Sequence, residues 1–90
     1  MQTNLLIGET FVEGQGAAED ILNPATGARI AAIPSASPEQ IDAAVTAAAD
    51  AFESWGRTTP GTRAGLLLNL ADRIEDDAEA FVELESQNCG

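Results

Sequence analysis

Three successive segments of the chain carry apolar side chains at helical spacing, and each segment has them on one side only. The first two stripes are Ile41, Ala44, Val45, Ala48, Phe52 and Trp55, and then Ala64, Leu67, Leu68, Ala71 and Ile74. The third stripe is Ala78, Phe81 and Val82, with Leu84 near its edge. Apolar residues that recur every three or four positions predict amphipathic helices. Because such helices are stabilised mainly by what covers their apolar side, this pattern demands a large covering surface.

Local signals mark where the first two helices begin. Ser37 can cap the first helix, Pro38 fits its first position, and Gln40 stands where it closes a capping box. Gly56 fits a helix stop. The pair Thr59-Pro60 repeats the order of cap and proline, and it predicts the start of the second helix.

The third helix has weaker boundary signals. The pair Asp76-Asp77 interrupts the second apolar stripe, and we expect it to cap the third helix, since a carboxylate there meets free backbone N–H groups. The last residues, Gln87 to Gly90, follow no pattern, so we expect no regular structure from them.

The first 36 residues predict short strands and turns. Residues 5–12 favour a β-hairpin, because their central Gly-Glu pair suits a type II′ turn. Residues 13–20 contain two glycines and favour a loop. Residues 21–22 then lead into a turn at residues 23–27, and residues 29–33 return as a strand. Two-stranded elements are marginal in water, so the 90 residues are expected to be one incomplete domain of a larger structure, with no second domain.

The charge of the chain limits its partners. Fifteen Asp and Glu against four Arg give a net charge of −11, with no Lys and no His. Such a chain repels phosphate backbones and anionic lipids, so nucleic acid and membrane surfaces are disfavoured partners. No apolar run approaches the ~20 residues that span a bilayer, and no signal-peptide pattern is present. The single cysteine can form no internal disulfide, which fits a cytoplasmic location.

Four stretches, in this order and at this spacing, resemble the N-terminal region of the aldehyde dehydrogenase superfamily. They are the hairpin at residues 5–12, the Asn-Pro-Ala-Thr-Gly turn at residues 23–27, the helix of residues 38–55, and residues 59–90. The resemblance covers essentially the whole chain. The ending Leu-Glu-Ser-Gln-Asn-Cys-Gly at residues 84–90 looks most like the ω-aminoaldehyde branch, which includes γ-aminobutyraldehyde and betaine-aldehyde dehydrogenases.

This resemblance implies an α/β parent enzyme with a Rossmann-type cofactor domain, of which this segment supplies a β-hairpin, short strands and three α-helices. Such enzymes oxidise an aldehyde to a carboxylic acid with NAD or NADP, through a cysteine nucleophile and a water activated by a glutamate. In the family these residues lie beyond the position of Gly90. The resemblance therefore implies that residues 1–90 hold no catalytic or cofactor-binding residue, are inactive alone and bind no cofactor. It also implies that their partner is the rest of a homo-oligomeric enzyme.

The reactive side chains of the segment have plainer interpretations. Gln87-Asn88-Cys89 resembles the Gln-x-Cys around the family's nucleophile, but it stands in the wrong part of the chain. Acidic neighbours are expected to raise the pKa of Cys89, whereas a nucleophile needs a lowered pKa. Glu79, Glu83 and Glu85 are expected to form a solvated helix face rather than an acid–base pair.

Neither glycine-containing turn makes a phosphate loop. Gly14-Gln15-Gly16 lacks a third glycine and a strand–helix frame, and residues 59–62 lack the lysine of a P-loop. Arg63 lies among apolar residues early in the second helix. We expect it to make a structural ion pair or to donate to a backbone carbonyl.

One metal site follows from the resemblance. Some family members hold a monovalent cation with backbone oxygens just before the Asn-Pro turn and an acidic side chain just before the final glycine of this segment. The matching residues here are Ile21, Leu22 and Asn88. Asn88 replaces the acid, which removes a charge, although an amide oxygen can still bind a cation.

A second hypothesis is a stand-alone acidic helical module that binds other proteins and has no catalytic activity. The acyl carrier proteins, which are small, acidic and helical, are the obvious comparison. They need Asp-Ser-Leu at a helix start, whereas this chain offers only Glu-Ser-Trp at residues 53–55 and Glu-Ser-Gln at residues 85–87, neither at a helix start. The N-terminal hairpin also has no place in that fold.

Overall fold

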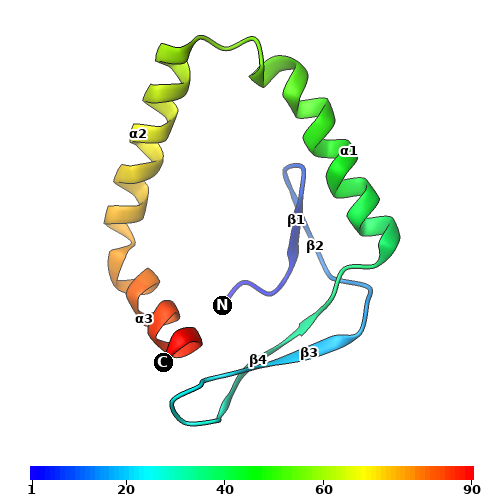
Figure 1. Ribbon diagram of the computed structural model, residues 1–90, viewed down its shortest axis with the longest axis vertical. Helices are drawn as coiled ribbons and strands as arrows, with labels where there is room; N and C mark the ends of the chain where they lie inside the picture. Colours follow the sequence, from blue (N-terminus) through cyan, green and yellow to red (C-terminus); the bar gives the residue numbers. More distant parts are fainter.

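The computed structural model describes residues 1–90 as an open ring of separate elements (Figure 1). In chain order these are β1 (Leu5–Ile7), β2 (Thr10–Val12), β3 (Ala18–Leu22), β4 (Arg29–Pro34), α1 (Pro38–Trp55), α2 (Pro60–Asp76) and α3 (Ala78–Cys89). Helices α1 and α2 form opposite sides of the ring, and α3 turns back toward the β3–β4 hairpin. The predicted order of a hairpin, a strand pair and three helices is confirmed.

The first hairpin forms as its turn residues predict. Strands β1 and β2 are antiparallel, and Ile7 pairs with Thr10. Gly8 has a φ of 63°, while no residue other than glycine has a positive φ. That combination fits a type II′ turn. The hairpin lies beside α1, and a Cβ added to Gly8 would stand 3.8 Å from the Cβ of Ala47.

The second hairpin is longer than predicted. Asn23 accepts a hydrogen bond from the N–H of Ala25 at 2.9 Å, and Gly27 completes the turn with a φ of 72°. The loop prediction for residues 13–20 is wrong at its end, because β3 begins at Ala18. The partner strand β4 satisfies the backbone of this polar stretch, and Asp20 also pairs with Arg29 at 3.4 Å. Pairing with a strand distant in sequence thus overrides the weak strand propensity of residues 18–20.

The first two helices begin at the predicted caps. Ser37 and Gln40 form the complete capping box of α1. The side chain of Thr59 accepts a hydrogen bond from the N–H of Thr62 at the start of α2. Helix α1 ends at Trp55, with Gly56 as its C-cap.

The third helix departs from its prediction at both ends. Asp77 occupies the N-cap position, but its side chain makes no capping hydrogen bond. Its backbone has φ −101° and ψ 18°, outside the extended region that N-caps usually adopt. At the other end, α3 continues through Cys89, so the expectation of no regular structure from Gln87 to Gly90 is wrong for residues 87–89. Bonds one helical turn apart support this last turn, since Asn88 Nδ2 donates to the carbonyl of Leu84 at 2.8 Å.

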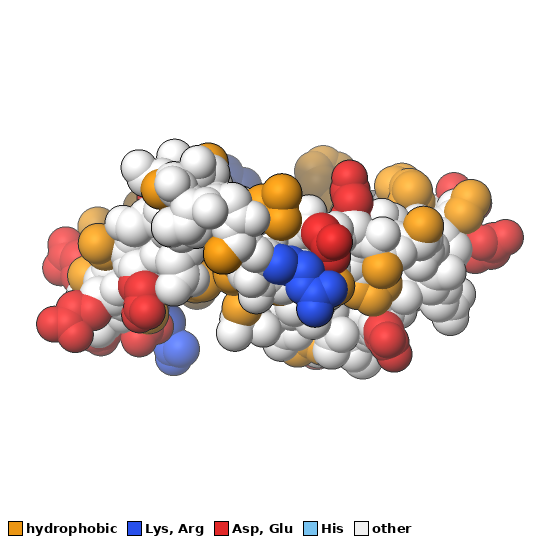
Figure 2. All heavy atoms as spheres, turned by 90° about the horizontal axis from the view of Figure 1, so that it is seen from below, with side chains coloured by type: hydrophobic (Ala, Val, Ile, Leu, Met, Phe, Trp, Pro, Cys, Tyr) orange, Lys and Arg blue, Asp and Glu red, His pale blue; other side chains and the backbone are white.

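The chain lacks a hydrophobic core. Only two residues are buried, and neither is a hydrophobic side chain. The radius of gyration is 16.7 Å, compared with about 12 Å for a compact domain of this length. The accessible surface is 7021 Å², roughly 2,000 Å² more than a folded monomer of this size exposes. Apolar side chains lie on the visible face among acidic ones (Figure 2). The side chain of Phe52 is 69% exposed.

Candidate functional site

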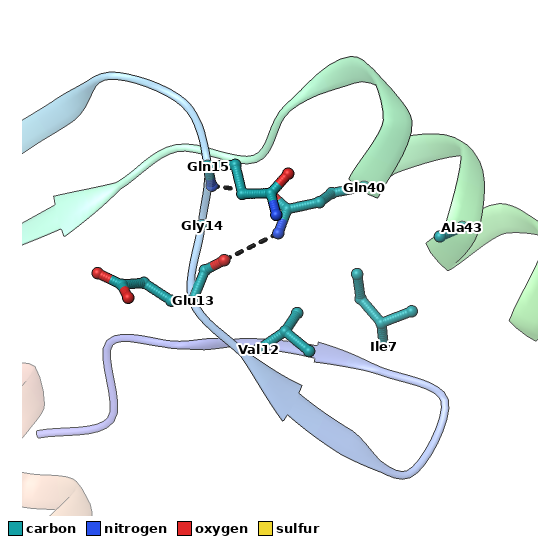
Figure 3. A pocket seen from close by; sticks show the side chains of 7 residues that line it. All are labelled: Ile7, Val12, Glu13, Gly14, Gln15, Gln40 and Ala43. Atoms are coloured by element: carbon teal, nitrogen blue, oxygen red, sulfur yellow. Dashed lines mark hydrogen bonds between the residues drawn. The ribbon is translucent and has the colours of Figure 1, made fainter.

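The best-organised part of the chain is a clamp made by Gln40, the one buried polar side chain, which is 8% exposed. Its Oε1 accepts hydrogen bonds from the N–H groups of Gln15 at 2.9 Å and Ser37 at 3.0 Å. Its Nε2 donates to the carbonyl oxygen of Glu13 at 2.8 Å. The side chain thus reaches from α1 to the loop after β2 (Figure 3). Both ends of the amide are satisfied, so the clamp fixes the loop against the start of α1.

Two glycines allow this loop to approach the segment before α1. A Cβ added to Gly14 would stand 2.4 Å from the carbonyl oxygen of Pro34, and one added to Gly16 would stand 2.8 Å from that of Ser35. The N–H of Gly16 donates to Ser35 at 2.7 Å, and the N–H of Gln15 donates to Gln40. These amides are therefore engaged within the chain and do not form an open cradle for a phosphate. This loop therefore does not fit the phosphates of a dinucleotide cofactor.

A hollow of about 580 Å³ lies between the first hairpin and α1, next to the clamp. Its lining is Ile7, Val12, Glu13, Gly14, Gln15, Gln40 and Ala43 (Figure 3). No buried polar side-chain atom in the chain is left without a hydrogen-bond partner. Glu13 is the only titratable residue of this lining. The hollow therefore presents apolar surface and no set of groups suited to acid–base or nucleophilic chemistry.

Cys89 is exposed at the end of α3, and its Sγ lies 3.2 Å from Glu85 Oε1. The hydrogen bond to Glu85 raises the pKa of the Cys89 thiol, and the negative charge of Glu85 and slight desolvation raise it further. The predicted direction of the pKa is confirmed. A thiol held protonated by a carboxylate has the opposite environment from an activated nucleophile.

The residues proposed for a monovalent cation lie in one region of the ring. Ile21 and Leu22 end β3, where the register of the β3–β4 pair shifts. A Cβ added to Gly90 would stand 3.3 Å from Cγ of Pro24, so the end of α3 lies against the turn that follows β3. Asn88 precedes Gly90, but its amide nitrogen is engaged with Leu84 and no hydrogen bond joins it to the strand. No cluster of His, Cys, Asp or Glu suited to a metal is present.

The expectation for Arg63 is wrong, because it makes neither an ion pair nor a side-chain hydrogen bond; the one ion pair of the chain joins Arg29 and Asp20. The residues three and four positions from Arg63 on α2 are Thr59, Pro60, Leu66 and Leu67, and none offers a carboxylate. Glu79, Glu83 and Glu85 are exposed, as are the apolar residues of the same helix, so the expected solvated face stays a prediction.

The clamp was not predicted from the sequence. The capping box already assigns Gln40 a local role, and its bonds to Glu13 and Gln15 span 27 and 25 residues. The available signal was the pair of glycines at 14 and 16, which marks a close backbone approach.

No helix of the chain is both long enough and apolar enough to cross a bilayer.

Comparison with known proteins gives the family. Residues 11–90 match the model of the aldehyde dehydrogenase family. An aldehyde dehydrogenase from Aspergillus niger is 40% identical over 88 residues, which cover 96% of this chain and 18% of that protein. Human 2-aminomuconic semialdehyde dehydrogenase is 34% identical over 90 residues, again 18% of its length.

The crystal structure of PnpE in complex with nicotinamide adenine dinucleotide matches 97% of this chain with a TM-score of 0.89 and 40% identity. The match covers 18% of the PnpE chain, so this chain spans less than a fifth of its relatives. Relatives named for 10-formyltetrahydrofolate and hydroxyisobutyraldehyde also match, so the similarity is not confined to aminoaldehyde enzymes. The clamp and the uncovered helices are therefore one segment of a larger fold, and the chain belongs to the aldehyde dehydrogenase family.

Proposed function

We propose that residues 1–90 are the N-terminal structural part of the cofactor-binding domain of an NAD(P)-dependent aldehyde dehydrogenase. The parent enzyme oxidises an aldehyde to a carboxylic acid, acts as a cytoplasmic homo-oligomer, and holds its reactive residues outside this segment. The supporting observation is a segment that matches 18% of PnpE with a TM-score of 0.89 and leaves its apolar helix faces uncovered. PnpE was solved with NAD, which makes a nicotinamide cofactor the expected oxidant of the parent.

In this proposal residues 1–90 have a structural role and supply none of the reacting groups. A nicotinamide cofactor, when bound to the parent, would supply the hydride acceptor for aldehyde oxidation. Residues 1–90 supply the clamp at Gln40, which fixes the first hairpin to α1, and the apolar sides of α1 and α2, which other parts of the enzyme cover. With no cofactor cradle and no activated thiol, the free segment is expected to be inactive.

A chimera tests this function. Residues 1–90 would replace the matching segment of the Aspergillus niger relative, and NAD(P)H formation from aldehydes would be followed by absorbance. We expect a soluble chimera with activity within about tenfold of the host, because the two segments are 40% identical over 88 residues. The host without the segment, and the free 90-residue chain, serve as inactive controls. An insoluble or inactive chimera would contradict the proposal and would favour a separate protein-binding module.

We also propose a substrate class for the parent enzyme, namely an aldehyde that carries an amino group. Its support is the ending of residues 84–90, together with a human relative named for 2-aminomuconic semialdehyde. The polypeptide that carries residues 1–90 would be isolated from its own cells and assayed with matched aldehydes. We expect a higher kcat/KM for 4-aminobutyraldehyde than for butyraldehyde. Equal values would remove the aminoaldehyde proposal and leave the family assignment intact.

We also propose that backbone oxygens of Ile21 and Leu22, with the Asn88 side chain, hold a monovalent cation in the parent enzyme. The support is the approach of Gly90 to Pro24, which brings the end of α3 to this turn. In the active chimera, potassium is expected to raise the melting temperature more than the larger tetramethylammonium ion does. An Asn88→Asp variant restores the charge and is expected to increase that difference, whereas identical melting curves in both salts would contradict the site.

A further inference from the structure

We draw no further inference here: the strongest candidate, the hollow between the first hairpin and α1 beside the Gln40 clamp, belongs to the site already described, and nothing in the structure shows what covers its apolar lining.

Discussion

The two halves of the ring differ in what holds them. From β1 to the start of α1, each turn is completed within the chain, and the Gln40 side chain joins segments 27 residues apart. From α2 onward, no residue is buried, and Leu67 and Leu68 are 63% and 68% exposed. The first half is held in shape by hydrogen bonds within the chain. The helices of the second half are formed by local caps and helix propensity, and no other part of this chain covers their apolar faces. A segment can thus have ordered elements without a core, if its core belongs to a larger protein.

The largest effect is expected from a substitution at Gly14, in the first half of the ring. A Gly14→Ala variant places a Cβ about 2.4 Å from the carbonyl oxygen of Pro34, so the loop has to move away from β4. We expect a loss of about 3 kcal/mol in the local stability of the clamp, the upper range for overpacking. Hydrogen exchange of the Gln15 and Gly16 amides would measure it.

The matched control for this substitution lies in the second half. Gly65 stands in α2 with nothing within 4 Å of an added Cβ. Gly65→Ala is therefore expected to stabilise α2 by up to about 1 kcal/mol, since alanine has the higher helix propensity. The same chemical change is expected to have opposite signs in the two halves. Faster hydrogen exchange around the substituted residue in both variants would contradict this difference between the two halves.

Removal of the clamp itself is the next largest change. Gln40→Ala leaves the carbonyl of Glu13 and the N–H of Gln15 without their partner, and also opens the capping box. We expect a loss of about 2 kcal/mol, since each hydrogen bond that the Gln40 side chain makes contributes about 1 kcal/mol. Exchange of the Gln15 amide would show it directly. Gln40→Glu keeps the acceptor but not the donor, so it is expected to protect that amide better than alanine does.

Sequence patterns predicted those parts of the fold that depend on neighbours in the chain. The capping box at Ser37, the start of α2 at Thr59 and the positive φ of Gly27 follow from residues within four positions. The start of β3 at Ala18 did not, because it depends on pairing with Pro34, which lies 16 positions along the chain. The long reach of Gln40 was missed for the same reason.

The candidate sites show the same difference between features set by neighbours in the chain and features set by distant residues. The raised pKa of Cys89 was predictable, since its cause, Glu85, lies one helical turn away. The missing partner of Arg63 was not, because an acidic chain suggests an ion pair without saying whether a carboxylate comes within reach. The cation residues Ile21, Leu22 and Asn88 stay a proposal.

Removal of the N-cap side chains is expected to have a smaller effect, which can be compared between the three helices. Ser37→Ala and Thr59→Ala each remove a side-chain acceptor from the first turn of a helix. We expect each to cost about 1 kcal/mol of local helix stability. Asp77→Ala is expected to cost much less, because Asp77 makes no capping hydrogen bond. Amide exchange in the first turns would rank the three, and an equal loss at Asp77 would show that α3 is capped in solution.

The smallest expected effect reports on the last turn of α3. Glu85 raises the pKa of the Cys89 thiol, chiefly by its hydrogen bond and also by its charge. A pKa raised in the folded chain favours the neutral thiol, so the stabilisation is present below the ordinary cysteine pKa and is lost as the pH rises through the raised value. Glu85→Gln removes the hydrogen-bonded carboxylate, so it is expected to lower the pKa of Cys89 and to speed alkylation of Cys89 at pH 8. Glu79→Gln, nearly three helical turns from the thiol, serves as the control for general charge. If Glu85→Gln left the rate unchanged, the 3.2 Å contact would not persist in solution, and the uncovered half of the ring would begin to fray at its last turn.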